Sequence, residues 1–153
     1  MTSKVVMSPL DRFPLAPSLA TPRLLIASSG AVGCGKTRFA LTGPAPVVVL
    51  SFDQGTEGVV EEFREEEDKE IRVINYDWAP TDEDDFSQAM AIDLRDRYIE
   101  DFKVACANAR TVVLDRETDL WSLFRYAEWG SPKGDMPKDF DKVNQRMRRY
   151  LQM

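Results

Sequence analysis

The residues with the most specific chemical pattern form one short segment, Gly30-Ala-Val-Gly-Cys-Gly-Lys-Thr37, which fits G-x-x-x-x-G-K-[ST]. Glycines allow the backbone to curl so that successive amide groups point at one anion, and a helix starting there adds positive potential. Lys36 can reach the β- and γ-phosphates of a nucleotide, and the hydroxyl of Thr37 is suited to bind Mg²⁺. The segment therefore predicts a nucleotide site. Its predicted contacts are Gly30, Gly33, Cys34, Gly35, Lys36 and Thr37.

Carboxylates that can serve a metal or a water molecule follow two predicted strands. Asp115 ends the aliphatic segment 111–114, a position from which a carboxylate can hold Mg²⁺ beside a phosphate loop. We therefore predict Thr37 and Asp115 as the metal-side residues. Hydrolysis also needs a group that orients the attacking water. Three acids are candidates for that role: Asp53, Glu57 and Glu117.

The predicted catalytic residues are Lys36, Asp53 and Glu117. For the two acids a structural role is equally natural, because Asp53 precedes a turn and Glu117 opens a predicted helix. Cys34 also has two interpretations. Its side chain either points away from the ligand or carries a thiol that is open to oxidation when the site is empty.

Alternating strands and helices are expected to position these residues. Four short aliphatic segments predict strands, of which the third contains Arg72 and is expected nearer a sheet edge. The predicted strands are 24–27, Val47–Ser51, Ile71–Asn75 and 111–114. The predicted helices are Lys36–Leu41, 56–68 with Thr56 as N-cap, one or two within 81–109, Glu117–Trp129 and about 139–153. This alternation predicts an α/β fold with a mostly parallel sheet.

The composition excludes several other kinds of site. The chain of 153 residues has no histidine, which excludes Ser-His-Asp triads and histidine-based zinc sites. Its net charge is −6, and the acids concentrate in 61–70 and 82–85, so a polyanion is expected to meet the ends of the chain instead. Two cysteines, no apolar run long enough for a membrane span and no signal-peptide pattern predict a cytoplasmic protein.

Three segments together are similar to the RecA-like P-loop ATPases of tailed phages, a family associated with single-strand annealing and recombination. They are the phosphate loop, Val47-Val-Val-Leu-Ser-Phe-Asp53-Gln-Gly55 and Val113-Leu-Asp115-Arg-Glu-Thr118-Asp-Leu-Trp121. The resemblance covers about 21–153 as one P-loop NTPase domain, preceded by a proline-containing arm, 1–20. It implies an ATP site with Mg²⁺, in the host cytoplasm, and an acid at the end of the strand beside the Asp115 strand. Asp53 matches that acid.

The resemblance also implies ATP hydrolysis coupled to single-stranded DNA and a homo-oligomer. The segment 130–137 matches the region where RecA-like proteins place a DNA-contacting loop. Trp129, Lys133 and Lys138 are therefore candidate contacts by stacking and charge, although an ordinary solvated loop fits the same residues.

Two departures from the family pattern stand out. Arg116 follows Asp115 where the family more often has a small hydroxyl residue. A further strand is also expected between the phosphate-loop strand and the Asp115 strand, and no segment remains for it. We therefore expect a C-terminally incomplete domain with its last strands missing; the alternatives are that another chain or a rearrangement fills the gap.

Two other functions share the phosphate loop. One is a small-molecule or nucleoside kinase, in which Arg146, Arg148 and Arg149 clamp a second phosphate. The other is a non-catalytic subunit that binds nucleotide as a structural element.

Overall fold

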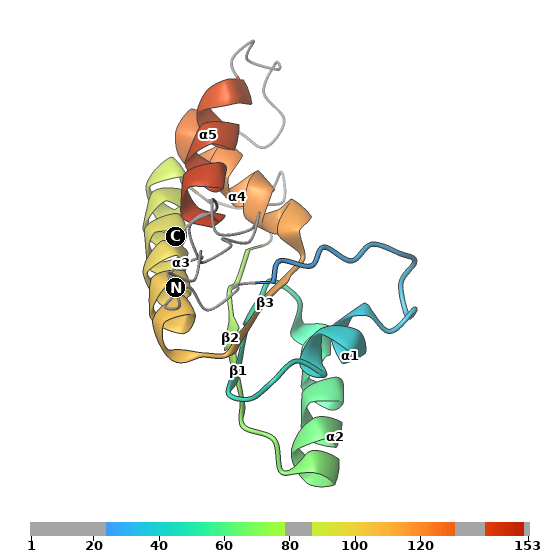
Figure 1. Cartoon of the computed structure of the whole chain (residues 1–153). Helices are drawn as coiled ribbons and strands as arrows, with labels where there is room; N and C mark the ends of the chain where they lie inside the picture. Colours follow the sequence, from blue (N-terminus) through green and yellow to red (C-terminus); the bar gives the residue numbers. More distant parts are fainter. Residues whose placement is uncertain (1–23, 79–86, 131–139, 152–153) are drawn as a thin grey trace, which may run out of the picture. The chain divides into compact units, whose positions relative to one another are not determined.

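Three parallel strands form the sheet of this chain in a computed structural model that describes residues 24–78, 87–130 and 140–151 (Figure 1). The strands are β1 (Val47–Ser51), β2 (Ile71–Asn75) and β3 (Thr111–Asp115), in the order β2-β1-β3. Ser51 at the end of β1 is in register with Asn75 on one side and Asp115 on the other. The α/β fold with a parallel sheet is confirmed, and β2 lies at the edge as Arg72 predicted.

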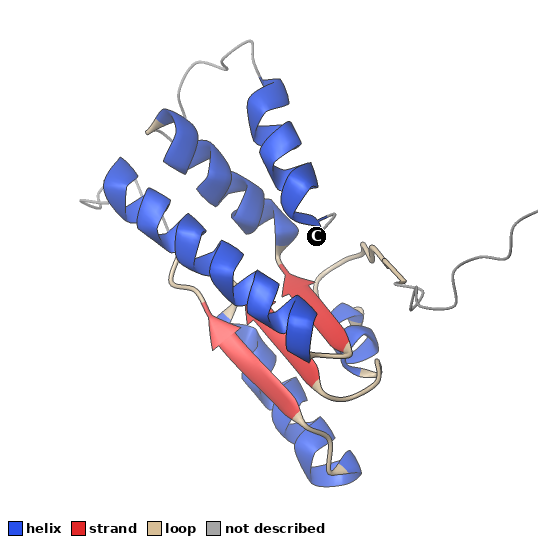
Figure 2. Cartoon of the chain, turned by 60° about the vertical axis from the view of Figure 1, so that its left-hand side comes forward, coloured by secondary structure: helices blue, strands red, loops and turns tan. Residues whose placement is uncertain are grey.

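Helices flank this sheet on both faces (Figure 2). Their bounds are α1 Lys36–Leu41, the short 3₁₀ helix η2 Gln54–Thr56, α2 Glu57–Glu67, α3 Gln88–Asn108, α4 Glu117–Trp129 and α5 Phe140–Leu151. The predicted helices at 36–41 and 117–129 are confirmed with these bounds. A single helix occupies the described part of the connection at 81–109, and the side chain of Ser87 caps it by accepting from the Met90 amide at 3.3 Å.

Alternation along the strands divides the core into two apolar clusters. On one face, α1 and α2 pack on the sheet through Leu41, Val47, Val49, Val60, Phe63, Ile71 and Val113. On the other, α3, α4 and α5 contribute to a larger cluster that contains Leu50, Phe52, Tyr76, Tyr98, Leu123 and Met147. Each helix thus buries one apolar stripe, and the strand ends meet at one edge between the two layers.

The predicted strand at 24–27 is wrong. This segment belongs to a separate unit, residues 1–30, whose described part (24–30) has no regular secondary structure. Leu24 and Leu25 are 84% and 83% exposed. An apolar run indicates that a segment favours burial, but a strand also needs a neighbour with which to pair. Within the described residues, β3 pairs with β1 alone, so the edge at which a further strand was expected is unpaired.

The predicted cap at Thr56 is confirmed in position but not in its hydrogen bond. Thr56 precedes α2 as predicted, but its side chain does not cap the helix, because its backbone is already helical, with φ −77° and ψ −19°. Its hydroxyl donates to the Asp53 carbonyl at 3.3 Å instead. The arm predicted at 1–20 lies outside the described residues. No helix in the described ranges is long and apolar enough to cross a membrane.

Candidate nucleotide site

The predicted phosphate loop is curled rather than extended. Gly33 and Gly35 have φ values of 78° and 84°, in the left-handed region that glycine occupies without steric cost. The Cys34 amide donates to the Ala31 carbonyl at 3.3 Å, and α1 begins at Lys36 directly after the loop. Residues 31–35 therefore have the tight backbone path that a phosphate-binding loop requires. Gly30, the first residue of the motif, belongs to the other unit.

The side chain of Lys36 folds back over this loop. Its ammonium group donates to the Ala31 carbonyl at 2.8 Å and lies 3.6 Å from the Cys34 sulfur. The positive charge therefore sits at the loop backbone, where an anion held by the loop amides would meet it. Thr37, the next residue, is partly buried in the first turn of α1, and Cys34 is exposed.

The side chain of Asp115 lies on the same face of the sheet as α1. Val113, two residues earlier in β3, packs in the α1–α2 cluster, and the side-chain alternation of a strand returns Asp115 to that face. Ser51 is fully buried and in register with Asp115, and the alternation along β1 places its side chain on the same face. The two side chains are in contact, with Ser51 Oγ 3.3 Å from Asp115 Oδ2. The predicted metal-side carboxylate and the phosphate-loop helix therefore share one side of the sheet.

Asp53 is held at the same edge by three groups. Its backbone amide donates to Ser51 Oγ at 3.0 Å, and its Oδ1 accepts from the Gly55 amide at 3.1 Å. Its other carboxylate oxygen, Oδ2, lies 3.2 Å from Arg116 Nε. The prediction that an acid follows the strand beside the Asp115 strand agrees with the order of β1 and β3.

Arg116 and Ser51 are the residues of this edge that the sequence did not assign. In the sequence, Arg116 is only a departure from the family pattern. In the structure, its guanidinium forms ion pairs with both Asp53 and Asp119. Ser51 gave no sequence signal, because a serine that ends an aliphatic strand is common. Its role depends on the register between β1 and β3.

Glu117 does not belong to the network of Asp53, Asp115 and Arg116. It is the exposed first residue of α4, and its charge acts on Tyr98, a member of the cluster on the opposite face of the sheet. Burial chiefly, together with the charges of Cys106 and Glu117, raises the pKa of Tyr98. Glu57 is the exposed first residue of α2. The structure therefore brings Asp53, Asp115 and Arg116 together and leaves these two acids outside their hydrogen-bond network.

The donor set available to a metal is sparse. Among the described residues, no group of three or more Asp, Glu or Cys side chains is placed to hold an ion. A hydroxyl and a carboxylate are oxygen ligands of the kind that Mg²⁺ takes, and in nucleotide sites this ion has one or two protein ligands beside phosphate oxygens and water. Thr37 and Asp115 are the residues that would hold it.

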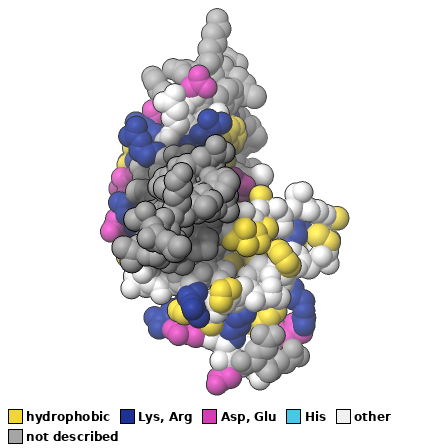
Figure 3. All heavy atoms as spheres, in the orientation of Figure 1, with side chains coloured by type: hydrophobic (Ala, Val, Ile, Leu, Met, Phe, Trp, Pro, Cys, Tyr) yellow, Lys and Arg dark blue, Asp and Glu magenta, His cyan; other side chains and the backbone are white. Residues whose placement is uncertain are grey.

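The candidate DNA contacts are only partly described. Trp129 lies at the end of α4, partly buried, with its ring 5.7 Å from the Arg125 guanidinium, while Lys133 and Lys138 lie outside the described residues. On the face shown in Figure 3, basic and acidic side chains are interspersed. Of the arginines considered for a kinase, Arg146 is paired with Glu128.

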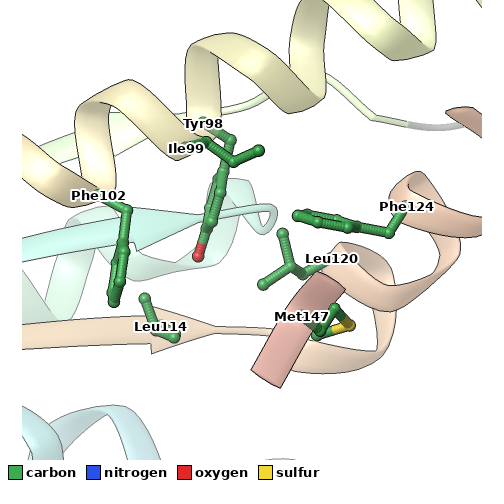
Figure 4. A pocket seen from close by; sticks show the side chains of 7 residues that line it. All are labelled: Tyr98, Ile99, Phe102, Leu114, Leu120, Phe124 and Met147. Atoms are coloured by element: carbon green, nitrogen blue, oxygen red, sulfur yellow. The ribbon is translucent and has the colours of Figure 1, made fainter. Parts of the chain in front are cut away.

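A small cavity lies under α5, on the face of the sheet opposite to α1. Its volume is about 10 Å³, close to the room of one water molecule, and its lining comes from α3, β3, α4 and α5 (Figure 4). The lining residues are Tyr98, Ile99, Phe102, Leu114, Leu120, Phe124 and Met147. The cavity is too small and apolar for a nucleotide, so it is separate from the candidate site.

No protein-family model matches the chain, and neither a curated protein nor a solved structure gives a match.

Proposed function

We propose that this chain is the nucleotide-binding domain of a RecA-like P-loop ATPase, which binds ATP with Mg²⁺ and couples its hydrolysis to single-stranded DNA in phage recombination. The observation that carries the proposal is the curled loop, in which two left-handed glycines precede α1 and the Lys36 ammonium folds onto the loop backbone. A loop of this shape presents amide donors and one positive charge to a phosphate chain.

The parallel sheet supplies the second part of the argument. Asp115 lies on the face of the sheet on which α1 packs. In the proposed site, this carboxylate and the Thr37 hydroxyl would hold Mg²⁺. Bound Mg²⁺ would neutralise phosphate charge during transfer. Asp53, fixed by Ser51 and Gly55 at the neighbouring strand end, is the acid best placed to orient an attacking water.

Titration with a fluorescent ATP analogue tests the nucleotide site directly. A hydrogen bond to a charged group contributes about 1.5–3 kcal/mol, so Lys36→Ala should weaken binding about 10- to 100-fold. Lys103→Ala is the matched control, since Lys103 makes an exposed ion pair with Glu100 on α3. Equal affinity of the Lys36→Ala and Lys103→Ala variants would contradict the proposal.

The DNA part of the proposal has its own test. ATP turnover of the parent chain should rise when single-stranded DNA is added, and DNA binding should weaken steeply with salt, because basic residues would displace counterions. If single-stranded DNA did not change the rate of ATP turnover and no DNA bound at low salt, the DNA part of the proposal would be refuted and only the nucleotide site would stand.

A non-catalytic nucleotide-binding subunit is the second candidate, and the Asp53–Arg116 ion pair favours it, because a paired carboxylate is a poor partner for water. The comparison of Lys36→Ala with Asp53→Ala separates the two. In an enzyme, Lys36→Ala weakens ATP binding about 10- to 100-fold, whereas Asp53→Ala loses turnover and retains binding. Absence of turnover in the parent chain, with intact ATP binding, would identify the non-catalytic subunit.

A further inference from the structure

Arg116 has an unusual backbone conformation at the junction between β3 and α4. Its φ and ψ are 61° and 65°, in the left-handed region that residues with a Cβ seldom occupy. Such conformations are strained and persist where the surrounding structure requires them. Here the conformation accompanies a side chain that reaches back to the end of β1, so both the backbone and the contacts of Arg116 are set by this edge of the sheet.

The guanidinium of Arg116 is shared between two carboxylates. Nε lies 3.2 Å from Asp53 Oδ2, and Nη1 lies 3.4 Å from Asp119 Oδ2. The side chain of Arg116 is 53% exposed and that of Asp53 is 41% exposed, so the ion pair is open to solvent. Exposed pairs of this kind contribute only about 0–1 kcal/mol, so breaking this one costs little.

We propose that Arg116 is an electrostatic latch, which pairs with Asp53 in the empty site and transfers to the terminal phosphate when ATP binds. The inference rests on the proposed function, because it takes Asp115 as the metal-side carboxylate. Arg116 is the next residue in the chain, and its guanidinium lies 3.2 Å from Asp53 Oδ2, at the strand end beside that of Asp115. A guanidinium fork matches phosphate oxygens and can donate two hydrogen bonds at once.

The two oxygens of Asp53 explain how the exchange would leave this residue in place. Oδ1 accepts from the Gly55 amide, whereas Oδ2 is the oxygen that lies 3.2 Å from Arg116 Nε. Departure of the guanidinium therefore frees Oδ2 while Gly55 and Ser51 keep Asp53 fixed. Arg116 acts as a positioning residue for Asp53 in the empty site and as a phosphate contact in the loaded one.

The latch predicts opposite effects for its two partners. Asp53→Asn retains an oxygen for the Gly55 amide but removes the charge that competes for Arg116, so its ATP affinity should rise about two- to fivefold. Arg116→Ala should bind ATP about tenfold more weakly, and ADP about as well as the parent does, because the lost contact is to the terminal phosphate. The double variant should resemble Arg116→Ala, because Asp53 affects affinity only through Arg116.

Fluorescent ATP and ADP analogues, titrated without turnover, measure these affinities, and thermal unfolding shows that each variant is folded. Arg72→Ala removes an exposed ion pair with Glu70 on β2 and is the matched control, with unchanged affinities expected. Arg116→Lys retains the charge and should restore part of the affinity. Asp53→Asn affinity equal to or below that of the parent overturns the latch alone, whereas absence of ATP binding by the parent overturns the proposed function and the latch with it.

Discussion

Removal of one buried hydroxyl should stabilise this protein. Tyr98 on α3 is 4% exposed and packs against Phe52 and Tyr76, with ring centroids 5.5 and 5.0 Å away. Its hydroxyl has no hydrogen-bond partner within the part of the chain that the structure describes. It points into the core beside the small cavity (Figure 4), where the other lining side chains are apolar, so a water molecule there would lack polar partners. Tyr98→Phe removes only this oxygen.

The expected gain follows from two opposing terms. A buried polar group without a partner costs about 1–3 kcal/mol, which the variant recovers. Loss of the oxygen removes a few van der Waals contacts of about 0.1–0.2 kcal/mol each. The net effect should be about 1 kcal/mol in favour of the folded state. For a chain of this size, that corresponds to a rise of about 2–4 °C in the melting temperature.

The neighbouring Tyr76 provides the matched control. Its hydroxyl donates to Asp101 Oδ2 at 2.9 Å, and Asp101 is a partly exposed side chain. Tyr76→Phe removes the same atom from the same aromatic cluster but breaks a hydrogen bond, so it should destabilise the protein by about 1 kcal/mol. Urea unfolding of both variants gives the two free energies. If Tyr98→Phe lost as much stability as Tyr76→Phe, the Tyr98 hydroxyl would have a partner and the reasoning would be refuted.

Two more predictions concern ionisable groups. Burial raises the pKa of both Tyr98 and Tyr76, with the Asp101 hydrogen bond adding to the effect at Tyr76. Tyrosines in the unfolded state have a pKa of about 10, so above that pH the unfolded state loses tyrosine protons that the folded state retains. The contribution of these two tyrosines to the free energy of unfolding should therefore be constant below about pH 10 and decrease above it. Urea unfolding at a series of alkaline pH values measures this, and unchanged stability there would contradict it. The exposed thiol of Cys34 should react more slowly with an alkylating reagent when ATP is added, and equal rates would count against its place in the site.

The sheet could be predicted from sequence because its strands are short aliphatic runs between turn residues. The segment 47–51 is apolar and largely buried, whereas 71–75, which contains Arg72, forms an edge strand in which Ile71 is the buried residue. The segment 24–27 has the same apolar character but is not a strand. Hydrophobicity identifies residues that favour burial, whereas strand formation depends on a partner with free backbone donors and acceptors.

The curl of the glycine-rich loop could be predicted for a different reason, because it depends on consecutive residues. Gly33, Gly35 and Lys36 are within four positions, and local backbone geometry places them together. The contacts of Asp53 and Arg116 are not local. They depend on the register of β1 with β3, which aligns residues 64 positions apart, and no sequence pattern specifies which side chains then meet.

The register between β1 and β3 also affects which acid would orient the attacking water in the proposed ATPase. Asp53 and Glu117 were equal candidates from sequence, since both follow predicted strands. In the structure, the fixed alternation of β3 directs Asp115 toward α1, while Glu117, two residues beyond in α4, acts electrostatically on Tyr98 on the other face of the sheet. Asp53 instead contacts Ser51, which itself contacts Asp115. If the chain hydrolyses ATP as proposed, these contacts favour Asp53 over Glu117 as the acid that orients the water, and Arg116 would first have to release Asp53.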